Sequence, residues 1–218
     1  MTHHSVILAT SYFPPIEYFV HISQSNHVFI ESHESYSKQS FRNRCYISGS
    51  NQIMPLSIPI SRGQKKLKDI KISYHDNWNL VHWRSIESYY NASPFFLYYK
   101  DDIEPFFSGK FNFLLELNNE ILYKILELIP LKTEINLTKS FENNYAEYTD
   151  LRYNIHPKID QPEKSFLINY PGYHQVFETR FGFLPNLSIL DLLFNEGPNT
   201  LEYLLSCKIT KRITPNNE

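Results

Sequence analysis

The first 32 residues alternate apolar runs with polar turns, a pattern that predicts a strand, a helix and a second strand. Residues 5 to 9, which include the run VILA, are predicted to be a buried strand, and HVFIES at 27 to 32 another. Between them, PIEYFVHISQ at 15 to 24 has helical periodicity with proline in the first turn, where its missing N–H loses no hydrogen bond. Such a short crossover favours parallel strands and a right-handed connection.

Further β-branched segments predict more sheet. They are RCYIS at 44 to 48, MPLSIPI at 54 to 60 and DIKISY at 69 to 74. TEINLTKSF, residues 133 to 141, alternates polar and apolar side chains as a half-buried strand does. The pattern therefore predicts an α/β fold with a mixed, mostly parallel sheet flanked by helices.

Two longer segments have helical periodicity. Residues 77 to 93 repeat apolar side chains at spacings of three and four, namely Leu80, Trp83, Ile86 and Tyr90. Residues 110 to 129 have a broad apolar face typical of a core helix. Near the C-terminus, Ser188 and Asp191 occupy capping-box positions, and Gly197-Pro198 separates that helix from a second short one.

We expect one domain over residues 1–218. Its parts differ in character: 1–75 is mainly sheet-forming, 76–130 helical, 142–186 loop-rich and 187–206 a helical tail. A long connection inside a compact domain is uncommon unless it has a function or is flexible. A binding loop and an ordinary surface excursion are equally open for the loop-rich part.

Charge and composition narrow the classes of partner. The chain has 21 basic and 23 acidic residues, so no global charge favours nucleic acid or an anionic membrane. Cys45 and Cys207 match no metal-ligand spacing, which predicts reduced thiols and a cytoplasmic location. We expect no leader, no membrane span, no metal and no cofactor, and the sequence does not indicate an oligomeric state.

Aromatic residues are unusually frequent, with 16 Tyr and 16 Phe. Most must pack in the core, but rings with a polar tip also form platforms for sugars and bases. Tyr12 lies directly after the first predicted strand, in TSYFPPIEYF. In an open parallel sheet, ligands bind at the carboxyl ends of the strands, so Tyr12 is a candidate substrate-binding residue.

A basic segment, YSKQSFRNRCYI, contains Lys38, Arg42, Asn43 and Arg44. In a strand, Arg42 and Arg44 would share a face and present two guanidinium groups to a carboxylate or phosphate. All four are therefore candidate ligands of an anionic substrate. A solvated basic edge strand explains the same pattern equally well.

The helix segment HWRSIESYY supplies a candidate general base, His82, close to Ser85 on one helical face. The adjacent Trp83 and Arg84 are candidate substrate-binding residues. The alternative is that His82 is a buried histidine hydrogen-bonded to the backbone.

The segment NYPGYHQVF places His174 and Gln175 just after a Pro-Gly turn flanked by tyrosines. His174 is a second catalytic candidate and Gln175 a substrate-binding one, although the segment is also explained as a turn alone. A glycine-rich phosphate loop, GxSxG, HExxH and CxxC are all absent from the sequence.

Taken in order, five blocks of the sequence resemble the WbqC-like protein family, which is named for a gene of bacterial O-antigen clusters. They are SYFPPIEYF, YSKQSFRNRCYISG, LSIPI, DIKISYHDNWNLVHWRSIESYYNASPFF and GFLPNLSILDLLFNEGP. The chain departs from the family pattern at Leu8–Thr10, in place of a His-Gln-Pro triplet, and at Ser32–His33, in place of an acidic pair. The resemblance implies a role in surface polysaccharide biosynthesis, and for some members the installation of an acyl or aminoacyl group on an amino sugar.

Two functions of different class remain open. In the first, the protein is a cytoplasmic transferase that acts on a nucleotide-linked amino sugar: arginines hold the anionic end, tyrosines stack the sugar and His82 moves a proton. In the second, it is a non-catalytic module that binds a glycan precursor or a partner protein. A third idea concerns the fold alone, because the opening also resembles that of nucleotidylyltransferases, with His21 as its local histidine.

Overall fold

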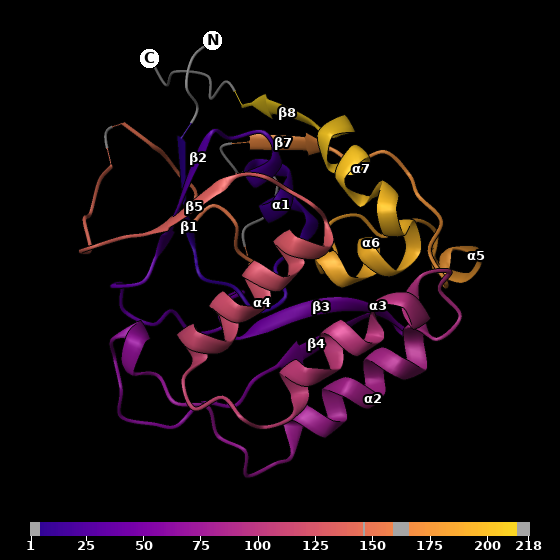
Figure 1. Cartoon of the computed structure of the whole chain (residues 1–218), viewed down its shortest axis with the longest axis horizontal. Helices are drawn as coiled ribbons and strands as arrows, with labels where there is room; N and C mark the ends of the chain where they lie inside the picture. Colours follow the sequence, from indigo (N-terminus) through magenta and orange to yellow (C-terminus); the bar gives the residue numbers. More distant parts are fainter. Residues whose placement is uncertain (1–4, 146, 159–165, 213–218) are drawn as a thin grey trace.

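A four-stranded parallel sheet is the largest sheet of the computed structural model, which describes residues 5–145, 147–158 and 166–212 (Figure 1). Its strands lie side by side in the order β5-β2-β1-β6. Their bounds are Glu134–Leu137, His27–Glu31, Ser5–Ala9 and Thr149–Asp150, respectively. All three pairings are parallel, and helices flank the sheet, so the protein is α/β as the sequence predicts.

The predicted strand-helix-strand unit is confirmed. β1 and β2 pair in parallel over their full length. Val6, Ile7 and Leu8 of β1 are fully buried. The helix between them, α1, spans Ile16–Ser23, and Pro15 is its N-cap. Proline therefore lies one position earlier than expected, at the N-cap, where its missing N–H interrupts no helical hydrogen bond.

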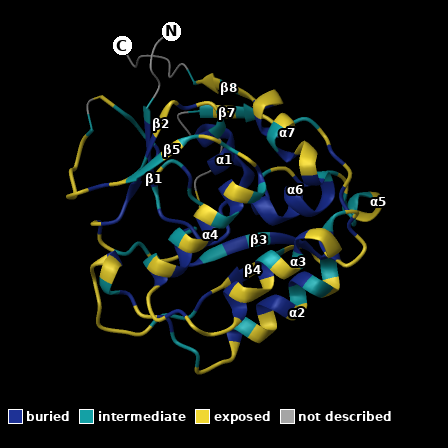
Figure 2. Cartoon of the chain, in the orientation of Figure 1, coloured by how far each residue is buried: buried dark blue, intermediate teal, exposed yellow. Residues whose placement is uncertain are grey.

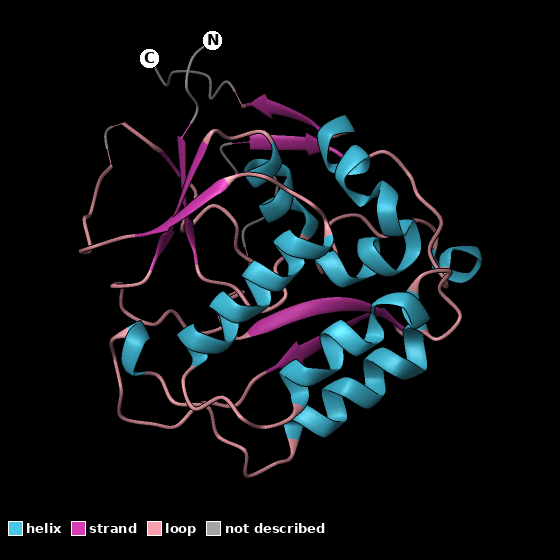
Figure 3. Ribbon diagram, viewed as in Figure 1, coloured by secondary structure: helices cyan, strands magenta, loops and turns pink. Residues whose placement is uncertain are grey.

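A separate antiparallel hairpin, β3 (Arg44–Gly49) and β4 (Gln52–Ser57), accounts for two of the predicted strands. It lies between α4 (Leu114–Leu128) and the pair formed by α2 (Trp78–Tyr90) and α3 (Phe96–Ile103) (Figure 3). Two residues connect its strands, a length typical of tight hairpins.

The prediction of a strand at 69 to 74 was wrong. The 3-10 turn η1, Leu67–Asp69, is followed by isolated bridges from Ile72 to Ile60 and from Lys71 to Phe113. Each pairing is a single isolated bridge, so no continuous ladder forms. Because the second bridge holds the chain extended at Phe113, α4 begins at Leu114 rather than near residue 110.

The helix predicted after Asn77 is confirmed as α2, but one of the four residues expected on its buried face is exposed. Trp83, Ile86 and Tyr90 are buried, whereas Leu80 is 50% exposed. α3 continues into the 3-10 turn η2, Glu104–Phe107. Figure 2 shows exposed residues along the outer sides of α2 and α3 and buried ones toward the hairpin.

The loop-rich part contains more structure than its sequence pattern suggests. Within it lie β6, β7 (Phe166–Asn169) and the single turn α5 (Glu178–Phe181). β7 pairs with β8 (Lys208–Lys211) as a second antiparallel pair. The strand that completes one edge of the parallel sheet thus comes from a segment without periodicity.

Two short helices follow, α6 (Ile189–Glu196) and α7 (Thr200–Ser206), separated by the 3-10 turn η4 (Gly197–Asn199), as predicted. The Ser188 hydroxyl accepts a hydrogen bond from the backbone N–H of Leu190, so the N-cap prediction is confirmed. Asp191 does not complete a capping box, because it accepts buried hydrogen bonds from Tyr90 and Tyr173 instead. In the described residues, no helix has the length and apolarity needed to cross a membrane.

Candidate binding site at the carboxyl edge of the sheet

The carboxyl ends of the four parallel strands meet at one edge of the sheet, as parallel pairing requires. The chain moves from β1 through α1 to β2 on one side, whereas β6 lies on the other side of β1. The strand order therefore changes direction between β1 and β6. Ligands of open α/β sheets bind outside the strand ends at such a switch point.

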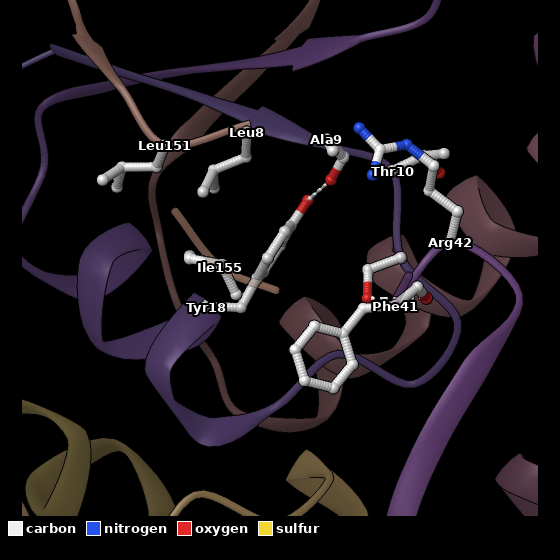
Figure 4. A pocket seen from close by; sticks show the side chains of 9 residues that line it. Leu8, Ala9, Thr10, Tyr18, Phe41, Arg42, Leu151 and Ile155 are labelled. Carbon is white, nitrogen blue, oxygen red and sulfur yellow. Dashed lines mark hydrogen bonds between the residues drawn. The ribbon is translucent and has the colours of Figure 1, made fainter. Parts of the chain in front are cut away.

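An internal cavity lies at this switch point (Figure 4). Its volume is about 10 Å³, enough for about one water molecule. The lining residues come from the ends of β1 and β6, from α1 and from the segment before β3: Leu8, Ala9, Thr10, Ser11, Tyr18, Phe41, Arg42, Leu151 and Ile155. Figure 4 shows the Arg42 guanidinium beside Thr10 and the Tyr18 hydroxyl bonded to the carbonyl of Ala9, at 3.0 Å.

Arg42 is held by a buried carboxylate rather than presented to solvent. Its Nε and Nη2 donate to the two carboxylate oxygens of Glu34 at 2.7 and 2.6 Å, and both side chains are at most 2% exposed. Burial raises the pKa of Glu34, although the hydrogen bonds from Arg42 oppose the shift. The expectation that Arg42 and Arg44 share a strand face is wrong, because β3 begins only at Arg44.

A second buried ion cluster surrounds Arg152. This side chain is fully buried and donates to Glu31 at 2.9 Å and to Asp150 at 2.6 Å. It also donates to the backbone oxygen of Glu142 at 2.9 Å. The two clusters touch, because Arg42 Nη2 lies 3.5 Å from the carbonyl oxygen of Arg152. Buried pairs of this kind fix the geometry of a site, since each charge requires its partner.

A surface groove of about 330 Å³ opens on the other side of Phe41. Its lining residues are Phe41, Tyr46, Ile53, His156, Pro157, Pro185, Asn186 and Leu187. Arg44 lies two residues before Tyr46 in β3, so the two side chains are on the same face of the strand. The Nε of Arg44 is buried and has no hydrogen-bond partner in the part of the chain that the structure describes.

The surroundings of this groove are cationic. Burial lowers the pKa of His156, and the charges of Arg42, Lys158 and Arg44 lower it further. The His156 Nδ1 accepts a hydrogen bond from the backbone N–H of Lys158 at 3.1 Å, as an uncharged imidazole does. Glu34 balances the charge of Arg42, so Lys158 and Arg44 supply the positive potential, which favours an anionic ligand at this position.

Two of the residues proposed from sequence, Tyr12 and His82, contact one another in the interior. The Tyr12 hydroxyl lies 3.0 Å from His82 Nδ1, and the two side chains are 1% and 4% exposed. Burial lowers the pKa of His82 to about 4, against a smaller opposite effect of the Ser57 backbone, and raises that of Tyr12. His82 is therefore neutral at physiological pH.

The basic segment and α2 supply four further candidates in different environments. Lys38 and Arg84 are exposed, whereas Asn43 is buried and donates to the carbonyl of Ile58 at 2.8 Å. Trp83 is 8% exposed, and its ring packs 5.5 Å from that of Phe107. Of these, Asn43 and Trp83 have structural contacts that account for their positions.

His174 and Gln175 are neighbours in sequence but have opposite surroundings. The His174 side chain is 71% exposed, with Nδ1 3.4 Å from Glu178. Gln175 is buried, donates to Asp191 at 2.7 Å and accepts from the backbone of Leu184 at 2.8 Å. The hydrogen bonds of Gln175 thus connect the turn to α6.

Sequence reasoning missed the carboxylates and the second arginine of the strand edge: Glu31, Glu34, Asp150 and Arg152. One signal was present: Glu31 ends β2 and Glu34 follows three residues later, and the carboxyl ends of the strands were expected to lie at a site. They flank Ser32 and His33, where the family pattern was found to differ. Arg152 gave no signal, since it lies in the segment without periodicity. Within residues 5–145, 147–158 and 166–212, no group of three potential metal ligands occurs.

These features describe an α/β protein with a four-stranded parallel sheet and buried ion pairs at its carboxyl edge. The chain belongs to the WbqC-like protein family, whose model matches residues 10–165, and this confirms the resemblance seen in the sequence. It is also similar to the uncharacterized protein Rv1507c of Mycobacterium tuberculosis, with 26% identity over 227 residues that cover 93% of this chain and 97% of that protein. No solved structure matches the chain.

Proposed function

We propose that this protein acts in the cytoplasm on a nucleotide-linked amino sugar during surface polysaccharide biosynthesis, of the O-antigen type, and transfers an acyl or aminoacyl group to it. Membership of the WbqC-like family supports the sugar pathway. The observation that best supports an anionic substrate is the groove beside Phe41, where the charges of Lys158 and Arg44 act on His156.

The groove suits a nucleoside diphosphate in size and chemistry. Its volume of about 330 Å³ is within the range of small-molecule sites. The Phe41 and Tyr46 rings, 5.9 Å apart and nearly perpendicular, offer apolar contact for a ring system. Arg44, with a planar fork of N–H donors, is the residue type best suited to phosphate oxygens.

The test of substrate binding is isothermal titration of the purified protein with UDP-N-acetylglucosamine, UDP and a panel of other nucleotide sugars. We expect at least one to bind, and Arg44→Gln to weaken that binding about tenfold or more through loss of a charge-assisted contact. Arg84→Gln, at an exposed arginine on α2, is the matched control and should bind as the original protein does. Absence of binding across the panel, or equal binding by the Arg44 variant, would overturn the proposal.

A specific observation favours a second candidate, a non-catalytic module that binds a glycan precursor. Acylation of an amine releases a proton, and His82, the base proposed from sequence, has a pKa of about 4 in the interior. Such a weak base retains a proton poorly at neutral pH.

Incubation of the protein with a bound amino sugar nucleotide and an acyl thioester, followed by mass spectrometry, distinguishes the transferase from the non-catalytic module. A mass increase equal to the acyl group supports the transferase. Tight binding without product supports the module.

A further inference from the structure

A second groove, of about 360 Å³, lies along β5 and the following segment. Its lining is partly aromatic and partly polar. The residues are Phe29, Asn136, Leu137, Thr138, Lys139, Ser140, Glu142, Tyr145 and Tyr148. None of them was a candidate from the sequence, and neither of the functions proposed above assigns it a role.

Three aromatic rings in this groove form a corner rather than a parallel stack. Phe29 and Tyr148 are 5.0 Å apart at 65°, and Tyr145 and Tyr148 are 5.9 Å apart at 73°. All three residues are half-buried, so each ring packs on one side and reaches the groove on the other. Such aromatic faces with polar groups beside them offer apolar contact to the C–H face of a ring and leave its polar groups free to bond at the rim.

The polar rim has no dominant charge. Lys139 and Glu142 contribute opposite signs, while Asn136 and Ser140 supply neutral groups that can donate and accept hydrogen bonds. This contrasts with the cationic groove at His156. The rim therefore suits hydroxyl and amide groups better than phosphate.

The groove is joined directly to the buried ion cluster. The Tyr145 hydroxyl lies 3.4 Å from a carboxylate oxygen of Glu31, and its ring centroid lies 4.8 Å from the guanidinium carbon of Arg152. The Tyr153 ring lies 5.9 Å from the guanidinium carbon of Arg42 and 5.7 Å from that of Arg152. One continuous set of contacts thus connects the groove to the switch-point cavity.

We propose that this groove binds the neutral ring of a hexose or N-acetylhexosamine, with a C–H face on Tyr148 and hydroxyl groups at the Asn136–Ser140 rim. The choice of a sugar over other ring compounds rests on the proposed function. The site itself is separate from the anionic groove and binds its ligand without phosphate.

Saturation-transfer difference NMR with methyl N-acetyl-β-glucosaminide tests this, because the probe is neutral and lacks a nucleotide. We expect saturation of the sugar ring protons in the original protein and loss of most of it in Tyr148→Ala. Tyr148→Phe keeps the ring and should keep the signal. Tyr123→Ala, at an exposed tyrosine on α4, is the matched control and should not change it.

A second variant, Ser140→Trp, fills the groove from its exposed rim and tests the site without removing a packed ring. Ser140→Trp should abolish the sugar signal, whereas Arg44→Gln should leave it intact. Loss of sugar binding is thereby distinguished from loss of nucleotide binding. No saturation transfer to the probe, or an unchanged signal in both Tyr148→Ala and Ser140→Trp, overturns the proposal. Displacement of the sugar by uridine at equal concentration also overturns it, because a flat base would then be the preferred occupant.

Discussion

Replacement of His82 by glutamine should remove a specific acid sensitivity of the fold. His82 is 4% exposed, and burial lowers its pKa from the ordinary 6.5 to about 4. Between these pH values the unfolded chain binds a proton at this position and the folded chain does not. Stability contributed by the neutral histidine is therefore complete above pH 6.5 and falls as the pH falls toward 4.

The size of the effect follows from the same two pKa values. One pKa unit corresponds to about 1.36 kcal/mol, so the loss linked to His82 is about 2 kcal/mol at pH 5 and about 3 kcal/mol below pH 4. Glutamine retains a polar group opposite the Tyr12 hydroxyl, so His82→Gln should fold. Its stability at neutral pH should drop by about 1 to 2 kcal/mol, in the ordinary range for a buried polar substitution.

Urea unfolding at a series of pH values from about 7 to about 5 measures the difference. The stability of the original protein should fall more steeply than that of His82→Gln, by about 2 kcal/mol more between pH 7 and pH 5, so that the two curves meet or cross. Other titrating groups affect both proteins alike and cancel in the comparison. His75→Gln, at an exposed histidine, should parallel the original protein. Parallel curves for His82→Gln would refute a buried, neutral His82.

Two further changes test the interior. Arg152→Ala leaves Glu31 charged and buried, and should reduce the free energy of unfolding, measured in urea, by about 3 to 5 kcal/mol. Adding Glu31→Gln should restore part of this loss. If the effects of the two substitutions were simply additive, the paired cluster would be contradicted. Gly197→Ala should be destabilising by about 1 to 3 kcal/mol in the same assay, because φ is 54° and a Cβ would lie 2.4 Å from the Phe95 ring; Gly172→Ala has open space and serves as the control.

Local features of the sequence predicted much of the framework. Proline at position 15 and the apolar runs on either side of α1 specified the first strand, the helix and the second strand, because these signals act within a few residues. The alternation in residues 133 to 141 predicted β5 correctly, including its half-buried character. The strand predicted at 69 to 74 failed because a 3-10 turn occupies its first residue and the rest makes only isolated bridges.

The position of the candidate site remains a prediction from the sheet rule, and the tertiary structure decides which side chains lie there. The rule that ligands bind at the carboxyl ends of parallel strands placed attention on the residues after β1, and the switch-point cavity lies there. The sequence predicted that Arg42 binds an anionic ligand. In the structure Arg42 instead forms an ion pair with Glu34, because the connection between β2 and β3 brings both side chains into the interior. No periodic pattern encodes that connection.

Thus the sequence by itself determined the α/β class, the family and the opening unit, since periodicity, proline and residue order are local properties. The tertiary structure decided which charges are paired. Glu31 and Arg152 are separated by 121 positions in the chain, yet lie 2.9 Å apart, because β6 pairs beside β1 and brings its carboxyl end to the same edge. Partners at such separation depend on the topology of the sheet, and the environment of Arg44 and His156 follows from it.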